Sequence, residues 1–470
     1  MHHIRQLAGE SFIYGLAGAV NALIQVFLLP LYTHTFSKAE LGVLEMVITT
    51  MNVLTLIAVL ALDNSAHRWY WGSESDEDRQ RTVSTWAWAN FATTTLFAAL
   101  IWLFAPWIAE RVSGDAAHAQ LYRIMSLTLP LGVLGLVTTG WLRMRRQPRL
   151  AITFTIGTSL LTVALVLLFV LVLKLGLIGV VYAQALAAVG ITIAGALILG
   201  PAVALPRFDM HRLREMLHFA LPLIPAALAA WVVAASGRYF VQVYQGSEQV
   251  AVYSVGLRIA VVAALVTTAF TTAWGPFALS IHQRPEAKEV YASALLWYLW
   301  ATCTVAAALS LFCRYILDLV TPQGYEGALA VIGMLAFSYV MIGLKFVAGV
   351  GHTIVRDNRP LGLAVTVSGL IFIGLSLLLV PRYGLVGAAL ATLISQALIP
   401  VYIFWRGQQV YAIPYRFGAA AFIVIVAGAV SLAGHFVTTT GWGDALVRVG
   451  LLAIYASTGL LLRLSNSPQR

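Results

Sequence analysis

Long apolar segments alternate with short polar intervals along almost the whole 470-residue chain. The segments are close to the ~20 residues that an α-helix needs to cross the hydrocarbon core of a membrane. They lack the alternating ~10-residue pattern of strands in an outer-membrane barrel. The pattern therefore predicts an all-α, multi-pass membrane protein with about 14 transmembrane helices. We place them at residues 10–33, 41–62, 84–109, 120–142, 150–173, 177–200, 216–239, 250–275, 290–312, 327–350, 360–380, 384–405, 417–437 and 444–463.

Composition supports this interpretation. The chain is 60% hydrophobic and 10% charged, with a mean hydropathy of +0.85, whereas a soluble domain has roughly a quarter of its residues charged. The net charge of +10 indicates basic cytoplasmic loops rather than a nucleic-acid partner. The first ten residues precede an apolar segment without a small-residue cleavage pattern, which favours an uncleaved first helix over a signal peptide.

The distribution of basic residues predicts the orientation. With the N-terminus inside, twenty Lys and Arg residues fall in the inner intervals and eight in the outer ones, while Arg258 lies within a span. Cytoplasmic loops carry the excess of basic residues in membrane proteins. We therefore expect both termini to be cytoplasmic.

Part of the sequence is repeated. The segment around Gly176 and Gly179 aligns with that around Gly384 and Gly387, an interval of 208 residues, and a weaker match joins residues 36–47 to 246–256. The alternative is that G-L-x-G-x-x-x-A is common helix-packing sequence. Duplication predicts two six-helix lobes related as parallel repeats, a common transporter plan. The lobes would be residues 1–205 and 206–410, followed by two additional helices in residues 411–470.

Arg258 lies about ten residues inside an uncharged apolar run that begins near Val250. Placing a guanidinium there costs roughly 2.5–3.5 kcal/mol on insertion scales, so such a residue faces the protein interior or a hydrated cavity. The alternative is a structural arginine that is bound to helix carbonyls or to a neighbouring carboxylate.

Five segments, in order, resemble the bacterial oligosaccharide-lipid flippases and polysaccharide biosynthesis transporters of the multidrug/oligosaccharidyl-lipid/polysaccharide exporter superfamily. They are LLPLYTHTFSKAELGVLEMV, ALDNSAHRWYW, GRYFVQVYQGSEQVAVYSVGLRIA, AWGPFALS and VPRYGLVGAALATLISQAL. The resemblance implies two lobes around a V-shaped cavity in the bacterial inner (plasma) membrane. It also implies movement of an undecaprenyl-diphosphate-linked oligosaccharide from the cytoplasmic to the outer leaflet. Membrane lipids, a polysaccharide polymerase and chain-length proteins are the partners that it implies.

Members of that family often carry an acidic residue where this chain has Gly237, so the resemblance does not extend to an ion pair or cation coupling at that position. Glu45 is the other acidic candidate, either as a carrier of a coupling proton or as a partner for a basic residue.

Four cations are candidates for binding the diphosphate, because basic side chains and especially the paired donors of arginine match phosphate oxygens. Arg258 is the first of them, and Arg238, Arg68 and Lys345 follow. For these three, an interfacial side chain that reaches the headgroup region is the alternative. Pro222, Pro225 and Pro276 are expected to break or kink their helices. Discontinuous helices are where transporters expose backbone groups to a cavity.

Two further patterns receive ordinary interpretations. The basic cluster RMRRQPR at 143–149 is typical of a cytoplasmic loop that sets topology, with contact to anionic headgroups as an addition. The aromatic run Trp69-Tyr70-Trp71 is typical of an interfacial belt.

Motifs of catalysis are lacking: the sequence has no Walker A loop, no dinucleotide-binding G-x-G-x-x-G, no H-E-x-x-H and no Cys/His metal spacing. We therefore expect no enzyme, no cofactor and no metal site. The alternatives to an oligosaccharide-lipid flippase are a flippase for the lipid-linked peptidoglycan precursor and a cation-coupled drug exporter. A membrane glycosyltransferase would need a large extramembrane loop or a catalytic carboxylate pair, and neither is visible.

The orientation can be tested with reporters that are active only in the periplasm. A fusion at either terminus should be inactive, whereas an insertion near residue 114, in an interval expected outside, should be active. Periplasmic activity at either terminus would overturn the assignment.

Overall fold

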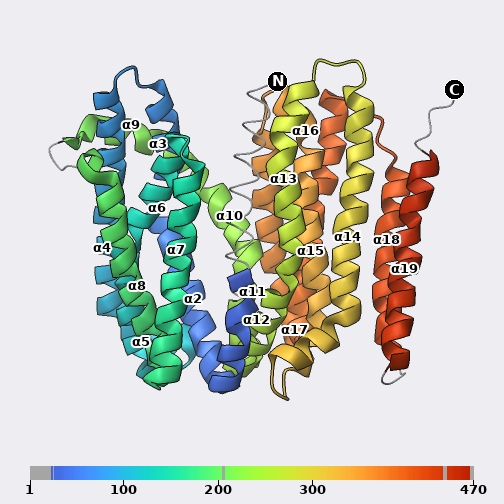
Figure 1. The fold of residues 1–470 in the computed structure, drawn as a ribbon, viewed down its shortest axis with the longest axis horizontal. Coiled ribbons are helices and arrows are strands. Elements are labelled where there is room, and N and C mark those ends of the chain that lie inside the picture. The colour runs from blue at the N-terminus through green and yellow to red at the C-terminus, as the bar shows by residue number, and fades with distance from the viewer. Residues whose placement is uncertain (1–22, 25, 204–206, 438–441, 466–470) are drawn as a thin grey trace. The chain divides into compact units, whose positions relative to one another are not determined.

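The computed structural model describes residues 23–24, 26–203, 207–437 and 442–465. Most of the predicted first span, 10–33, therefore lies outside the described residues. The described part is helical throughout and contains no strand (Figure 1). Up to Val203 it comprises α2 (Lys38–Ala58), α3 (Leu62–Gly72), α4 (Asp76–Ser113), η1 (Ala116–His118), α5 (Ala119–Ser126), α6 (Thr128–Met144), α7 (Pro148–Leu167), η2 (Leu168–Val172), α8 (Gly176–Leu199) and η3 (Gly200–Val203).

The remaining helices follow the gap at 204–206. They are α9 (Met210–Ala220), η5 (Leu221–Leu223), α10 (Ile224–Ala235), α11 (Gly237–Gln245), α12 (Ser247–Ala260), α13 (Val262–Ile281), α14 (Ala287–Val320), η6 (Glu326–Ala328), α15 (Leu329–Ala348), α16 (Val350–Ile354), α17 (Arg359–Val410), α18 (Phe417–His435) and α19 (Trp442–Ser465).

Eleven helices of the described residues are long and apolar enough to cross a membrane. The all-α, multi-pass fold class is thereby confirmed. The predicted spans 360–380 and 384–405 form one continuous stretch, α17, which is 52 residues long but contains non-helical dihedrals at Gly384. A straight helix of that length would be more than twice as long as a bilayer requires. Gly384 therefore joins two spans, as the sequence predicts.

The chain divides into two compact units, at residues 33/34 and 251/252. One unit is residues 34–251, and the other combines residues 252–470 with the first 33. The lobes expected from the repeat, 1–205 and 206–410, divide the chain elsewhere and stay a prediction.

The 34–251 unit is held together by close helix approaches at small residues. Gly140 of α6 lies under the fully buried Trp86 ring of α4, where a Cβ would come within 2.6 Å of the indole. Gly195 of α8 also lies close to α6, since a Cβ there would be 3.2 Å from the Leu134 carbonyl oxygen. Packing at small residues is a main source of helix association in membranes, where the hydrophobic effect between helices is weak.

The same unit contains a break that the sequence analysis missed. Leu60 and Ala61, between α2 and α3, have φ of 54° and 50°, in the left-handed region. The hydroxyl of Thr93 on α4 donates to the Ala58 carbonyl at 2.7 Å. A backbone group released by the break is thereby satisfied, as the bilayer environment requires.

In the other unit, α14, α15 and α17 form the central packing. The hydroxyl of the buried Tyr298 on α14 donates to the Val340 carbonyl of α15 at 2.7 Å. Gly343 of α15 allows this approach, because a Cβ at that position would be 2.1 Å from the Tyr298 oxygen. Trp274 of α13 adds a 3.2 Å hydrogen bond to the Phe346 carbonyl.

Element boundaries recur at the interval of the sequence repeat. The starts of α2 and α12 are 209 positions apart, those of η1 and η6 are 210 apart, and those of α5 and α15 are also 210 apart. The aligned Gly176 and Gly384 both have positive φ, at 64° and 54°. The aligned Gly179 and Gly387 both lie against a backbone carbonyl of the preceding segment. The repeated glycines therefore build the same tight helix joint twice.

A second repeated joint was not foreseen. Arg146 and Arg356, 210 positions apart, both have left-handed backbone, with φ of 54° and 60°. The residue after each donates to a carbonyl five positions back, from Gln147 to Leu142 and from Asp357 to His352. This is the Schellman termination of a helix, in which the left-handed position is usually glycine.

The prolines differ in their effects. Pro222 lies in the short η5 turn and Pro225 at the start of α10, so the segment from α9 to α10 is interrupted there. Pro276, by contrast, lies inside α13, which continues to Ile281. The interruption in that region falls at Val261, between α12 and α13, so a complete break at Pro276 is wrong, whereas a kink there stays a prediction. Proline removes only one intrahelical hydrogen bond, and a transmembrane helix tolerates that loss.

The helix α19 is attached to α14 by a buried polar cluster. Arg448 forms an ion pair with Asp444 at 2.7 Å and also donates to the Leu311 carbonyl of α14. The Tyr315 hydroxyl of α14 donates to the same Asp444 carboxylate at 2.7 Å. Both charged residues are less than 10% exposed.

Replacing Arg448 should therefore destabilise this attachment, because a buried carboxylate without its cation is more costly than a pair of apolar residues. We expect Arg448→Met to lower the melting temperature of the purified protein by several degrees. The double variant Arg448→Met, Asp444→Asn should recover much of the loss, and Arg382→Gln, an exposed arginine on α17, is the matched control. Equal melting temperatures for Arg448→Met and the control would contradict this role.

Candidate functional site

Arg258, the first candidate from the sequence, is half-buried near the end of α12. Its guanidinium carbon lies 5.3 Å from the centre of the Tyr32 ring. An arginine stacked on an aromatic face gains a cation–π interaction, which is worth more when the pair is desolvated. The planar guanidinium carries its N–H donors in a fork whose geometry matches phosphate oxygens.

Lys345 lies in the last turn of α15, in the same unit as Arg258, and is half-buried. Its Nζ atom is 5.3 Å from the ring centre of the adjacent Phe346.

Arg68 belongs to the 34–251 unit and is exposed on α3. Its guanidinium lies 4.7 Å from the ring centre of Phe219 on α9 and 5.8 Å from that of Trp69. The Trp69 indole donates to Glu215 of α9 at 3.1 Å. Arg68 is therefore part of a contact that joins α3 to α9.

Two candidates from distant parts of the sequence meet. Glu45 of α2, with 4% of its side chain exposed, lies 3.4 Å from the Arg238 guanidinium of α11. One turn farther along, the hydroxyls of Thr50 and Tyr239 are 2.8 Å apart. Position 237, next to Arg238, is a glycine and has no carboxylate. Glu45, on another helix, supplies the carboxylate that pairs with Arg238.

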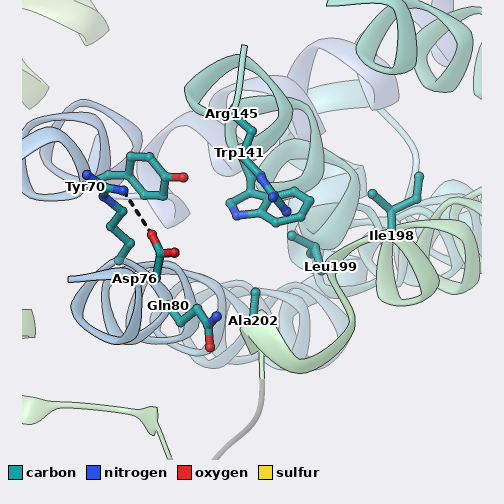
Figure 2. A pocket seen from close by; sticks show the side chains of 9 residues that line it. Tyr70, Asp76, Gln80, Trp141, Arg145, Ile198, Leu199 and Ala202 are labelled. Atoms are coloured by element: carbon teal, nitrogen blue, oxygen red, sulfur yellow. Dashed lines mark hydrogen bonds and ion pairs between the residues drawn. The ribbon is translucent and has the colours of Figure 1, made fainter. Parts of the chain in front are cut away.

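A pocket in the 34–251 unit was not predicted as a site. It has a volume of about 270 Å³ and lies where α3, α6 and α8 end and α4 begins (Figure 2). Arg79 lies 5.7 Å from the ring centre of Tyr70, and Arg145 lies 4.9 Å from that of Trp141. The lining consists of Tyr70, Asp76, Arg79, Gln80, Trp141, Arg145, Ile198, Leu199 and Ala202.

The sequence did contain a signal for this pocket. Tyr70 belongs to the aromatic run at 69–71, and Arg145 belongs to the basic cluster at 143–149. Each was interpreted by itself, as an interfacial belt and as a topology signal. Their meeting in one pocket depends on tertiary packing. Within the described residues, no group of three or more His, Cys, Asp or Glu side chains is placed to hold a metal ion.

Several solved structures share this fold. A structure described as lipid II flippase MurJ in an inward closed conformation matches with a TM-score of 0.77 and 14% identity, over 94% of this chain and 97% of that one. A multidrug resistance MATE family transporter of the MOP superfamily matches in its outward-facing conformation with a TM-score of 0.61 and 16% identity, over 89% and 96%. Its inward-facing conformation gives a TM-score of 0.60, also at 16% identity, over 90% and 96%.

These likenesses show that the chain shares the fold of these membrane proteins, and its long apolar helices fit that fold. Residues 7–282 match the family described as polysaccharide biosynthesis protein. That match covers more than half of the chain, which therefore belongs to this family. The resemblance identified from the sequence segments is confirmed. No curated protein matches the chain by sequence.

The Glu45–Arg238 pair can be measured by a double-mutant cycle with Glu45→Gln, Arg238→Gln and the double variant. Because both side chains are largely buried, the coupling free energy of unfolding should exceed about 1 kcal/mol, above the median for surface pairs. The matched control is the cycle for Glu77 and Arg81, an exposed pair one helical turn apart on α4. Equal coupling in the two cycles would show that burial adds nothing to the Glu45–Arg238 interaction.

Proposed function

We propose that this protein is a flippase that moves undecaprenyl-diphosphate-linked oligosaccharide from the cytoplasmic to the outer leaflet. The product would serve the assembly of a surface polysaccharide or lipopolysaccharide O-antigen. The match to the polysaccharide biosynthesis protein family over residues 7–282 carries the proposal. The expected location is the bacterial inner membrane, with both termini cytoplasmic. A polysaccharide polymerase and chain-length proteins would act on the exported product.

The chemistry of such a substrate explains the positions of the cations. The polyprenyl tail can remain in the lipid, while the anionic diphosphate and the polar glycan must cross the hydrocarbon core. A hydrated cationic cavity lowers this barrier, because the charge-assisted hydrogen bonds of arginine replace water around the phosphate oxygens. Arg258, half-buried in α12 and stacked on Tyr32, is suited to this role. Lys345, Arg238 and Arg68 would add positive charge along the path.

The Glu45–Arg238 pair refines the role of Arg238. A carboxylate at 3.4 Å neutralises part of its charge, so Arg238 would attract the diphosphate less strongly than Arg258 does. Protonation of Glu45 would remove that competition, which is how this pair could couple transport to a proton gradient. Transport by alternating access then needs no ATP-binding motif, and the chain has none.

A flippase for the lipid-linked peptidoglycan precursor is the second candidate. The observation that favours it is the likeness in fold to lipid II flippase MurJ, at a TM-score of 0.77. The two substrates share a lipid diphosphate, so the same cations would serve both. Neighbouring genes distinguish the candidates: glycosyltransferases and a polymerase would favour the oligosaccharide, and cell-wall synthesis genes the precursor. A drug exporter is less suited, because Arg258 would repel a cationic drug.

The direct test is Arg258→Ala in a strain that depends on this protein for its surface glycan. We expect export to be lost while the protein level and membrane insertion stay normal, and Arg258→Lys to retain part of the activity, because lysine keeps the charge without the paired donors. Arg314→Ala, an exposed arginine on α14 of the same unit, is the control and should export normally. Full export by Arg258→Ala at a normal protein level would exclude the proposed role.

A further inference from the structure

The pocket formed by α3, α4, α6 and α8 (Figure 2) combines two arginines with aromatic and apolar surfaces. Tyr70 and Trp141 are largely buried, and each lies under a guanidinium. A cation–π contact with a buried ring restricts the position of each guanidinium before a ligand arrives. Preorganisation of this kind reduces the entropy that binding must overcome.

One donor in the pocket lacks an acceptor. Arg79 forms an ion pair with Asp76 through Nη1 at 3.0 Å, marked by the dashed line in Figure 2. Its Nε atom is buried and has no hydrogen-bond partner among the described residues. Buried donors are nearly always satisfied in folded proteins, so the hydrogen bonding of Arg79 is incomplete among the described residues. Asp76 is 87% exposed at its side chain, so solvent screens its repulsion of an incoming anion.

The size of the pocket limits the ligand. At about 270 Å³ it lies just below the roughly 300–1,000 Å³ of sites for drug-sized molecules. A single phosphate-bearing headgroup fits this space. The apolar side of the pocket, formed by Ile198, Leu199 and Ala202, can contact the uncharged part of such a headgroup.

The surroundings are those of a membrane surface. The expected topology places these helix ends at the cytoplasmic face, where bacterial lipids with anionic headgroups meet basic residues. Next to the pocket, Arg146 lies 5.5 Å from the ring centre of Trp71. Leu197 of α8, one residue before the lining, is 79% exposed. An acyl chain could lie against that surface while the headgroup occupies the pocket.

We propose that this pocket binds a small phosphate-bearing headgroup, with Arg79 and Arg145 as the donors and Tyr70 and Trp141 as their supports. An anionic lipid and a soluble phosphate ester share this chemistry, and both are tested below.

The measurement is the binding of lipids to the purified full-length protein by native mass spectrometry. The probes are phosphatidylglycerol, phosphatidylcholine and glycerol 3-phosphate. We expect Arg79→Gln, Arg145→Gln to weaken phosphatidylglycerol binding by at least about tenfold, because two charge-assisted hydrogen bonds are lost. The matched control, Arg149→Gln, Arg214→Gln, removes two exposed charges outside the pocket and should stay within about threefold of the parent protein.

Equal weakening in the two double variants, or equally tight binding of phosphatidylcholine, would overturn the proposal. If glycerol 3-phosphate competes when its concentration equals that of the lipid, the ligand is a soluble phosphate ester. If it does not compete, the ligand is the lipid. Arg145 is exposed, so Arg145→Gln alone provides the result if the double variant does not fold. Unchanged binding by that single variant would also overturn the proposal. None of these measurements depends on glycan export.

Discussion

A charge inside the membrane must be surrounded by protein groups or water, because the hydrocarbon offers nothing to replace its hydration. Three groups of charged residues in the long helices meet this requirement in different ways. Arg258 has the face of Tyr32, Glu45 has Arg238, and Arg448 has Asp444 with Tyr315. Asp444 lies on the same helix as Arg448, but Tyr32, Arg238 and Tyr315 come from other segments of the chain, so these contacts restrict how the helices can pack. The charged residues thus act as fixed points for an otherwise apolar assembly.

The backbone is subject to the same requirement, and it explains where helices end. At the break between α2 and α3, the hydroxyl of Thr93 on α4 donates a hydrogen bond to the released carbonyl of Ala58. At the repeated joints, the turn itself satisfies the released groups through Schellman hydrogen bonds. At these described breaks, another group or the turn itself completes the hydrogen bonding. Pro276, which costs a single bond, leaves α13 continuous.

The positions of the spans follow from the sequence because the bilayer imposes a length and an apolar composition that are local properties. The joint at Gly384 was also predictable, from its alignment with Gly176. The break at Leu60 and Ala61 was not, since neither residue type favours a left-handed backbone. Among the candidate site residues, each cation could be recognised by itself, because a charge within an apolar run costs free energy in a membrane. Their partners could not: the contact of Glu45 with Arg238 joins residues 193 positions apart, and local patterns carry no information about such distances.

Arg146 and Arg356 have a consequence for how the chain enters the membrane. A left-handed residue other than glycine costs roughly 1–2 kcal/mol, and glycine would remove that strain at both turns. Glycine would also remove a positive charge from a short loop, and such charges bias the side on which a loop is retained during insertion. With both turns on the expected cytoplasmic side, the two arginines would favour correct insertion at some cost to the stability of the finished fold. A chain optimised only for thermal stability would lose the arginines, and with them part of the signal that orients its helices.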